Sequence, residues 1–465
     1  MKQTVNILKM MSLLLVAALT LTVSSCGDDD APTFVNPNSG DADAAAAQGN
    51  TTTVTISLDG IAEGVSAEGI EVQLRNISTG SIFTQYADAT GTAVFHVVPG
   101  IYEGTATGTS SVDGYLYTFN GNLGQIVVKE NEAASVRIEM KSGRKGQIII
   151  KELYNGGCSK DDGKSFQFDK CVILYNNSSQ RVSAANLCFG FASPANAQAN
   201  NKNYGEDGKL VYEAAGFIPA WHGIWYFPDT LTIEPYSQIV VNICGAIDNT
   251  LTVSNSVNYA NAEYYCMYDP ESGYNNPNYY PTPSEKIPTS HYLKAVELGL
   301  GNGWTFSVSS PAMILFQTKD VKPADYATNT ANMWYDGGNE GNQVWACTKV
   351  HNEWIIDGIE VFAAAYKEGG DCVKRLTSDI DAGYVWLTNY QGHTLYRNVD
   401  KEATEALPEN AGKLVYSYSL GVDSSTDPSG INAEASIKNG AHIVFMDTNN
   451  SSNDFHERQR CSLKD

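Results

Sequence analysis

Thr53-Val54-Thr55-Ile56-Ser57-Leu58 places an apolar side chain at every second position, and this alternation decides the fold of the first unit. Successive side chains of a β-strand point to opposite faces, so such a segment buries one face and exposes the other. Ile70, Val72 and Leu74 repeat the pattern. Further segments of the same kind follow at 82–87, 93–98, 102–107, 115–119, 125–129 and 135–140. Short strands at regular spacing predict a β-sandwich over residues 51–142.

A turn inside this unit resembles a known family. Asp88-Ala89-Thr90-Gly91-Thr92-Ala93-Val94-Phe95, followed by Val98-Pro99-Gly100-Ile101-Tyr102, is similar to the carboxypeptidase regulatory-like domain, a transthyretin-type sandwich. Gly91 allows the tight turn and Phe95 is expected in the core. The resemblance implies a spacer or a binding platform. Related surface sandwiches form Lys–Asn isopeptide crosslinks, but the first strand here contains no Lys, which argues against that chemistry.

Residues 146–465 are expected to form a second sandwich. Ile148-Ile149-Ile150 leads into Glu152-Leu153-Tyr154-Asn155, and apolar segments follow at 168–178 and 231–241. This order resembles the lamin-tail domain, an immunoglobulin-like sandwich. With the segments at 392–397 and 441–451, the region is similar to an uncharacterised Bacteroidetes surface-lipoprotein family, a resemblance that implies no established activity. The expected fold class is therefore all-β, with a transthyretin-like sandwich followed by an immunoglobulin-like or lamin-tail-like one.

The stretch from about 250 to 382 is too long for a sandwich loop, and we expect it to be an insertion in the second unit. Tyr is frequent in its first part, interleaved with Asn and Pro. Tyr combines a flat face with a hydroxyl group and suits ligand binding at low entropic cost. The candidate ligand-binding residues are therefore Tyr268, Tyr274, Tyr279 and Tyr280. The alternative is that these side chains pack within a loop that folds on itself.

The first 25 residues have the form of a lipoprotein signal peptide. Lys2 and Lys9 precede an uncharged apolar stretch at 10–23, which is short for a bilayer span and ends in small residues. The following Cys26 resembles the acylated Cys of a bacterial lipobox. The resemblance implies that Cys26 carries lipid chains sufficient for stable anchoring in the outer membrane.

An acidic segment follows the lipidation site. Asp28, Asp29 and Asp30 resemble the export signal of Bacteroidetes lipoproteins, which implies that the protein faces the cell exterior. A lipoprotein that faces the periplasm is the alternative. Residues 26–50 carry no Lys or Arg and almost no core-forming side chains, so we expect a flexible acidic linker between the lipid and the body.

Charge and cysteine content restrict the partners and the compartment. The 465 residues have a formal net charge of −22, which disfavours nucleic acid as a partner. Eight cysteines lie beyond residue 150, an even number in an expected oxidising compartment, and we expect most of them to be paired. Cys158 and Cys171 flank a polar loop and are the preferred local pair. Sequence alone does not fix the connectivity.

No sequence motif for catalysis or cofactor binding points to a functional residue. The sequence contains no HExxH, GxSxG, CxxC or phosphate-binding glycine loop, so we expect no catalytic residue, metal site or cofactor. Oxygen donors of the kind that calcium prefers gather near the C-terminus, and turn formation explains them equally well; they are Asp447, Asn449, Asn450, Asn453 and Asp454.

The expected function is a non-catalytic binding or accessory module on the outer membrane, which captures a nutrient together with a TonB-dependent transporter. One alternative is a glycan-active enzyme whose carboxylates the sequence does not identify. Another is a structural or adhesive surface protein. A converging carboxylate pair in a cleft would favour the enzyme, an aromatic groove would favour binding, and a flat surface would favour the structural role.

Overall fold

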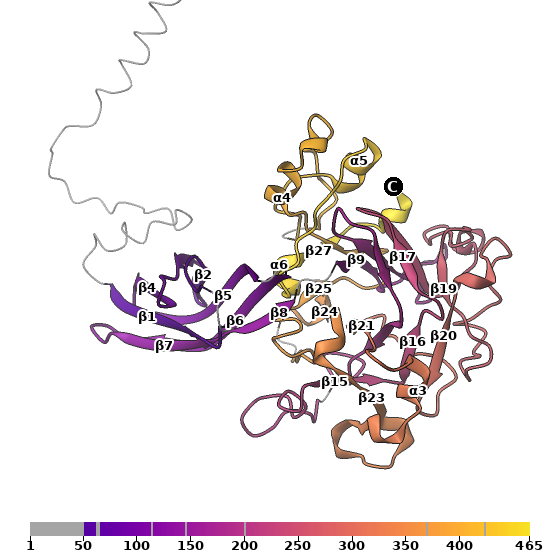
Figure 1. The fold of residues 1–465 in the computed structure, drawn as a ribbon, viewed down its shortest axis with the longest axis horizontal. Helices are drawn as coiled ribbons and strands as arrows, with labels where there is room; N and C mark the ends of the chain where they lie inside the picture. The colour runs from indigo at the N-terminus through magenta and orange to yellow at the C-terminus, as the bar shows by residue number, and fades with distance from the viewer. Residues whose placement is uncertain are drawn as a thin grey trace, which may run out of the picture.

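The predicted fold class is confirmed, because the protein is built almost entirely of β-strands. A smaller N-terminal unit lies beside a larger C-terminal unit (Figure 1). Within the part of the chain covered, no helix is both long and apolar enough to cross a bilayer. The computed structural model describes residues 51–61, 66–112, 115–144, 147–199, 201–368, 371–422 and 425–465.

The N-terminal unit is a sandwich of two sheets, with strand orders β4-β1-β7 and β3-β2-β5-β6-β8. Side chains of β1 alternate between buried and half-exposed positions, as the sequence pattern predicts. The inward side chains, including Ile56 and Phe95, form one apolar core between the sheets. The strands are β1 (Thr52–Asp59), β2 (Glu71–Asn76), β3 (Ile82–Tyr86), β4 (Thr92–Val97), β5 (Gly100–Val112), β6 (Tyr115–Val128), β7 (Ala134–Glu139) and β8 (Lys141–Arg144).

The turn before β4 forms as its sequence predicts. Gly91 has a φ of +76°, a left-handed conformation that glycine adopts without strain. Asp88 Oδ1 accepts hydrogen bonds from the backbone N–H groups of Thr90 and Thr92, at 2.8 and 3.0 Å. The aspartate side chain thereby fixes the turn that aims β4 into the sandwich.

The C-terminal unit is organised by one twelve-stranded sheet, ordered β25-β24-β21-β14-β16-β20-β19-β18-β12-β9-β26-β27. Its two ends approach each other, since the N–H of Thr388 after β25 donates to Glu457 Oε1 of β27 at 2.8 Å. The strands are β9 (Ile148–Tyr154), β12 (Lys170–Asn176), β14 (Leu187–Phe191), β16 (Gly223–Tyr226), β18 (Gln238–Cys244), β19 (Tyr265–Met267), β20 (Tyr292–Glu297), β21 (Ala312–Gln317), β24 (Ile355–Ala363), β25 (Val385–Leu387), β26 (Thr394–Arg397) and β27 (Phe455–Arg458).

Shorter elements cover this sheet. The helices α4 and α5 lie together on one side of the unit (Figure 1). The strands are β10 (Cys158–Ser159), β11 (Ser165–Phe166), β13 (Val182–Ala184), β15 (Phe217–Trp221), β17 (Leu231–Ile233), β22 (Met333–Tyr335) and β23 (Ala346–His351), and the helices are α3 (Pro323–Ala327), α4 (Lys401–Glu405), α5 (Ala433–Lys438) and α6 (Ser451–Asp454).

The stretch from about 250 to 382, expected to be an insertion, is an integral part of the sheet. It supplies β19, β20, β21 and β24, which sit between strands from the rest of the unit. The expectation is corrected for a physical reason. Strands such as β21 are buried along almost their whole length, so their sequences lack the alternation that reveals a half-exposed strand.

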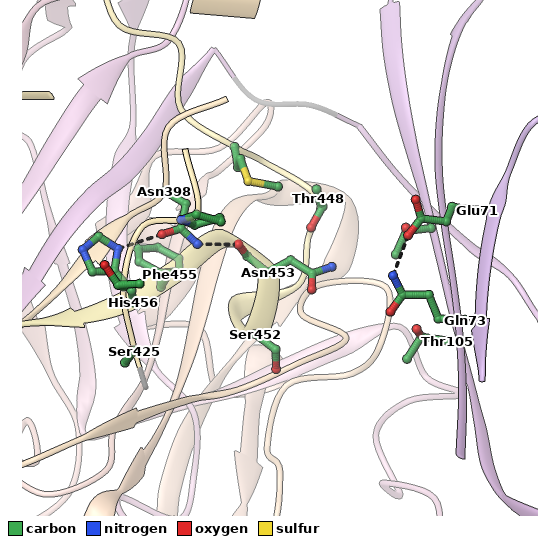
Figure 2. Close-up of a pocket in the computed structure, with 14 residues that line it drawn as sticks. Glu71, Gln73, Thr105, Asn398, Ser425, Thr448, Ser452, Asn453, Phe455 and His456 are labelled. Atoms are coloured by element: carbon green, nitrogen blue, oxygen red, sulfur yellow. Dashed lines mark hydrogen bonds between the residues drawn. The ribbon is translucent and has the colours of Figure 1, made fainter. Parts of the chain in front are cut away.

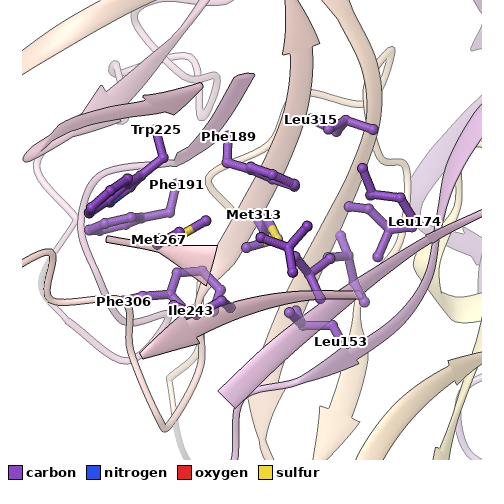
Figure 3. Close-up of a cluster of buried hydrophobic side chains, with 14 of the residues drawn as sticks. Leu153, Leu174, Phe189, Phe191, Trp225, Ile243, Met267, Phe306, Met313 and Leu315 are labelled. Carbon is purple, nitrogen blue, oxygen red and sulfur yellow. The ribbon is translucent and has the colours of Figure 1, made fainter. Parts of the chain in front are cut away.

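Large apolar and aromatic side chains fill the main core of the C-terminal unit (Figure 3). Phe191, Trp225 and Trp304 are fully buried there, and the Phe191 and Trp304 rings meet edge to face at 5.0 Å between centroids. Such pairs add to the stabilisation that comes from burial alone. The core includes side chains from strands in both halves of the unit, such as Leu153 of β9 and Val361 of β24.

Buried ion pairs join distant segments of the C-terminal unit. Arg375 and Glu360 have no exposed side-chain surface, and Arg375 Nη2 lies 2.6 Å from Glu360 Oε1. Arg375 Nη1 also donates to the carbonyl oxygen of Ser310 at 2.8 Å. Buried charges persist only when they are paired and hydrogen-bonded, so these contacts fix the relative positions of the segments involved.

The two units are tied together through β6. The side-chain amide of Asn120 donates to the carbonyl oxygen of Thr448, and that of Asn122 donates to the carbonyl oxygen of Ala382 at 3.0 Å. Asn120 is buried in this contact. Beside this junction the walls of the two units separate and leave a cleft.

Candidate functional site

The cleft between the two units is a candidate site among the residues that the structure covers. Its volume is about 510 Å³, within the usual range for ligand pockets. Figure 2 shows Gln73 and Thr105 on one side, with Thr448 and Asn453 on the other. The lining consists of Glu71, Gln73, Thr105, Thr107, Asn398, Ser425, Thr426, Pro428, Met446, Thr448, Ser452, Asn453, Phe455 and His456.

The N-terminal wall of the cleft is the outer face of β2 and β5. These strands are antiparallel, and Glu71 pairs with Thr107 while Gln73 pairs with Thr105. The intervening Val72 points into the sandwich core, so the four polar side chains share the opposite face. Gln73 Nε2 donates to Glu71 Oε1 at 2.7 Å. This wall therefore presents a fixed patch of hydroxyl, amide and carboxylate groups.

The C-terminal wall is built by α6, β27 and the segment before them. At its floor, His456 is buried, with Nδ1 2.7 Å from Asn398 Oδ1 and Nε2 in contact with the Tyr418 hydroxyl. Burial, with the nearby positive charge of Arg458, lowers the pKa of His456 to about 3. His456 is therefore neutral at physiological pH, and Asn398 in turn donates to the carbonyl oxygen of Asn453 at 2.6 Å. The floor is rigid and uncharged.

The Tyr residues predicted to bind a ligand lie elsewhere, and two of them are core residues. Tyr274 and Tyr280 are 1% and 7% exposed and belong to the main core, where both rings lie 5.6 Å from Trp225. Tyr279 and Tyr268 are half-buried, and Tyr279 packs edge to face on Phe168. The prediction is therefore wrong for Tyr274 and Tyr280, which pack in the core as the alternative expected, because β19 and β20 place this segment in the sheet. For Tyr268 and Tyr279 ligand binding stays a prediction.

The predicted cysteine pair is also corrected. Every cysteine that the structure covers is a free thiol, including Cys158 and Cys171. Cys158 hydrogen-bonds with Asp169, and burial, reinforced by that carboxylate, raises its pKa to about 12. Cys171 instead contacts Cys461, which lies at the other end of the unit's sequence. Closeness in sequence therefore did not predict which cysteines are in contact.

Two of the oxygen donors that were considered for calcium, Asp447 and Asp454, pair with an arginine. Asp447 and Asp454 lie 3.5 and 3.6 Å from the Arg397 guanidinium, which is fully buried and also pairs with Asp357. Asp454 further accepts hydrogen bonds from the backbone N–H groups of Thr448 and Asn450. The guanidinium supplies the positive charge that a cation would bring. Throughout the covered ranges, no cluster of three or more His, Cys, Asp or Glu residues is arranged to hold a metal ion.

The lipidation site and export signal, Cys26, Asp28, Asp29 and Asp30, lie outside the described residues. Of the residues that line the cleft, only Asn453 was singled out from the sequence, and as an oxygen donor for calcium rather than as part of a cleft. Gln73 and Thr105 occupy outward positions of strands whose alternation was recognised, so their exposure was predictable. Their position opposite Asn453 was not, because it depends on how two units with separate cores dock.

Part of the chain is similar to a known protein family. Residues 234–419 match the family described as "Protein of unknown function (DUF4876)". No curated protein is similar enough to count as a match. A solved DUF4876 family protein from Bacteroides thetaiotaomicron VPI-5482 is 18% identical, with a TM-score of 0.47 over 87% of this chain and 94% of that one. A DUF3823 family protein from Parabacteroides merdae ATCC 43184 is 9% identical, with a TM-score of 0.15 over 30% of this chain and 66% of that one.

Proposed function

We propose that this chain is a surface-exposed outer-membrane lipoprotein that binds a polar, uncharged ligand in the cleft between its two units. The lining of the cleft carries the proposal. Hydroxyl and amide groups from two separately folded units face one hollow, and its volume is that of a small-molecule site. A few placed polar groups on rigid elements are what specific recognition requires.

The composition of the lining favours binding over hydrolysis. Glu71 is the one carboxylate among the covered residues that line the cleft. Glycoside cleavage generally uses two carboxyl groups on either side of the bond. Glu71 already accepts a hydrogen bond from Gln73, which suits it to orient a ligand hydroxyl. This supports a binding module over a glycan-active enzyme.

The family resemblances fit the same role. A carboxypeptidase regulatory-like first unit would serve as a binding platform, and a lamin-tail-like second unit would supply the opposing wall. A ligand captured outside the outer membrane must then cross it, so the fitting partner is a TonB-dependent transporter. The formal charge of −22 keeps such a body away from anionic lipid and nucleic acid.

The proposed anchor is tested by fractionation. Cys26→Ala should remove lipid labelling and release the protein from the membrane fraction, because the acyl chains supply the membrane affinity. Replacing Asp28, Asp29 and Asp30 by Ala should leave the protein lipidated but protected from protease on intact cells. Asp41→Ala with Asp43→Ala is the matched control, since it removes acidic charge from the same segment. Unchanged surface exposure of the triple variant would contradict the export signal.

The cleft is tested by thermal shift. Wild type and Thr105→Trp are heated with uncharged mono- and disaccharides, amino acids and dipeptides. Thr105 lies on the outer face of β5, so the indole should fill the cleft without entering a core. A compound that binds the folded state raises the melting temperature. We expect at least one compound to stabilise wild type and not Thr105→Trp. Equal shifts for both proteins, or none for either, would contradict the proposal.

A further inference from the structure

A second hollow adjoins the cleft and extends it. It has a volume of about 280 Å³ and shares Ser425, Ser452 and Phe455 with the cleft. Its other lining residues include Tyr384 and Trp386, which flank Val385 at the start of β25. The two hollows therefore meet at the three residues that they share, and together they are called the groove, with a polar end between the units and an aromatic end on the C-terminal unit.

The aromatic end is a rigid wall. Phe362, buried on β24, stacks under Tyr384 with ring centroids 4.1 Å apart and an angle of 18° between the planes. The Trp386 ring meets Tyr384 edge to face at 5.5 Å. Val385 and Leu387 point into the core, so the two outer rings are presented by a strand anchored on both sides. Tyr384 remains 36% exposed, which leaves a face open for contact.

This aromatic wall is only partly buried, although Tyr384 packs on Phe362 and Lys367 Nζ lies 6.0 Å from the Trp386 ring centroid. Large side chains at outward strand positions forgo the stabilisation of full burial. Their rings stand directly beside a row of hydroxyl and amide groups, a pairing that suits a ligand with one apolar face and a polar edge. Sugar rings have this character, since their C–H groups form a flat apolar face and their hydroxyl groups project from the rim.

The charge of the groove restricts the ligand further. Glu71 and Lys367 are the charged side chains among the covered residues that line it, and they lie at opposite ends. They differ in sign, so the side chains that line the groove carry no net charge that would select an ion. The acidic protein as a whole repels anions. The lining thus favours a neutral chain with many hydroxyl groups.

Resting on the proposed function, we infer that the groove binds a neutral oligosaccharide. One sugar ring stacks on Trp386 and Tyr384, and the following units run past Ser452 into the cleft. There Gln73, Thr105 and Asn453 hydrogen-bond with their hydroxyl groups. Recognition by stacking at one end and hydrogen bonds at the other requires a chain rather than a single sugar.

The test uses two printed arrays, one of neutral oligosaccharides with four to eight units and one of uncharged tetrapeptides. Wild type should bind oligosaccharides on the first array. Trp386→Ala and, from the other unit, Gln73→Ala should each weaken that binding about tenfold, the effect of losing one central contact. Tyr416→Ala is the matched control, because Tyr416 is an exposed aromatic residue outside the groove. Melting temperatures of all variants separate loss of binding from loss of fold, and Gln73→Ala keeps the test valid if Trp386→Ala unfolds.

The outcomes distinguish the two levels of the proposal. Tetrapeptide binding that Gln73→Ala weakens would overturn the oligosaccharide and leave the cleft as a binding site. Oligosaccharide binding that none of the groove variants changes would overturn the groove as its site. The absence of binding on both arrays would overturn the oligosaccharide, and the thermal-shift panel then decides the cleft independently.

Discussion

The two units of this protein use opposite solutions to the problem of building a core from strands. In the N-terminal unit, strands such as β1 alternate between buried and half-exposed positions, and ion pairs lie on the surface. In the C-terminal unit, β9 and β12 are buried at every position. Charged side chains there, such as Arg375 and Arg397, are enclosed with their partners.

The difference shows where each unit's stability resides. A sheet with one solvent-exposed face can form its core with apolar side chains at alternate positions alone. A sheet covered on both faces must also satisfy the polar groups of the segments that cover it, and buried ion pairs do this at the cost of desolvation. The first unit should therefore tolerate loss of its ion pairs, whereas the second should not.

Breaking a buried ion pair should produce the largest effect. Arg375→Met leaves the Glu360 carboxylate buried without its partner, and we expect a loss of about 4–5 kcal/mol in unfolding free energy. Arg75→Met is the matched control, because the Arg75–Glu103 pair has side chains 57% and 44% exposed and should contribute less than about 1 kcal/mol. Urea unfolding of both variants measures the difference. Similar losses would remove the contrast between the units.

The Tyr-rich segment should behave as core. Tyr280→Ala removes a ring packed against Trp225, and its hydroxyl oxygen also accepts a hydrogen bond from the N–H of Trp304 at 2.9 Å. We expect a loss of about 3–4 kcal/mol in unfolding free energy, with oligosaccharide affinity unchanged where the protein is folded. Calorimetry gives the first quantity and titration gives the second. A stable variant that no longer binds the oligosaccharide would instead indicate that the binding site lies in this segment.

The cleft floor should make stability depend on pH. The pKa of His456 is about 3 in the folded protein against 6.5 ordinarily, so the unfolded chain takes up the proton first as the pH falls. This contribution is complete above about pH 6.5 and declines towards pH 3. Between pH 7 and pH 4 it should amount to about 3 kcal/mol. His456→Gln should lose less stability than wild type over this interval, and exposed His96→Gln should not differ from wild type.

These contrasts also explain what the sequence could predict. The period-two segments around Ile56 and Val72 identified the first sandwich, because a strand with one buried face alternates apolar and polar residues along its sequence. The strands β19 and β21 were not recognised, because β19 is short and β21 is buried along almost its whole length, and both features remove the alternation. Tyr274 and Tyr280 were accordingly predicted to bind a ligand, although both belong to the main core.

The candidate site could be predicted only in part. Tyr384 and Trp386 flank a core residue, which is a local signal of aromatic side chains at outward positions. The sequence around them could not predict that they lie near Gln73, since Gln73 belongs to the other unit. It depends on contacts such as the one from Asn120 to the carbonyl oxygen of Thr448, across 328 positions of the chain.

Backbone hydrogen exchange, with and without a neutral hexasaccharide selected from the array, tests the central claim most directly. The proposed ligand lies between β5 and the segment that contains α6 and β27. We therefore expect slower exchange at 103–107 and 446–456 when the sugar is bound, with Thr105→Trp showing no such change. Protection confined to 259–292, where the Tyr residues gather, would contradict the cleft as the binding site.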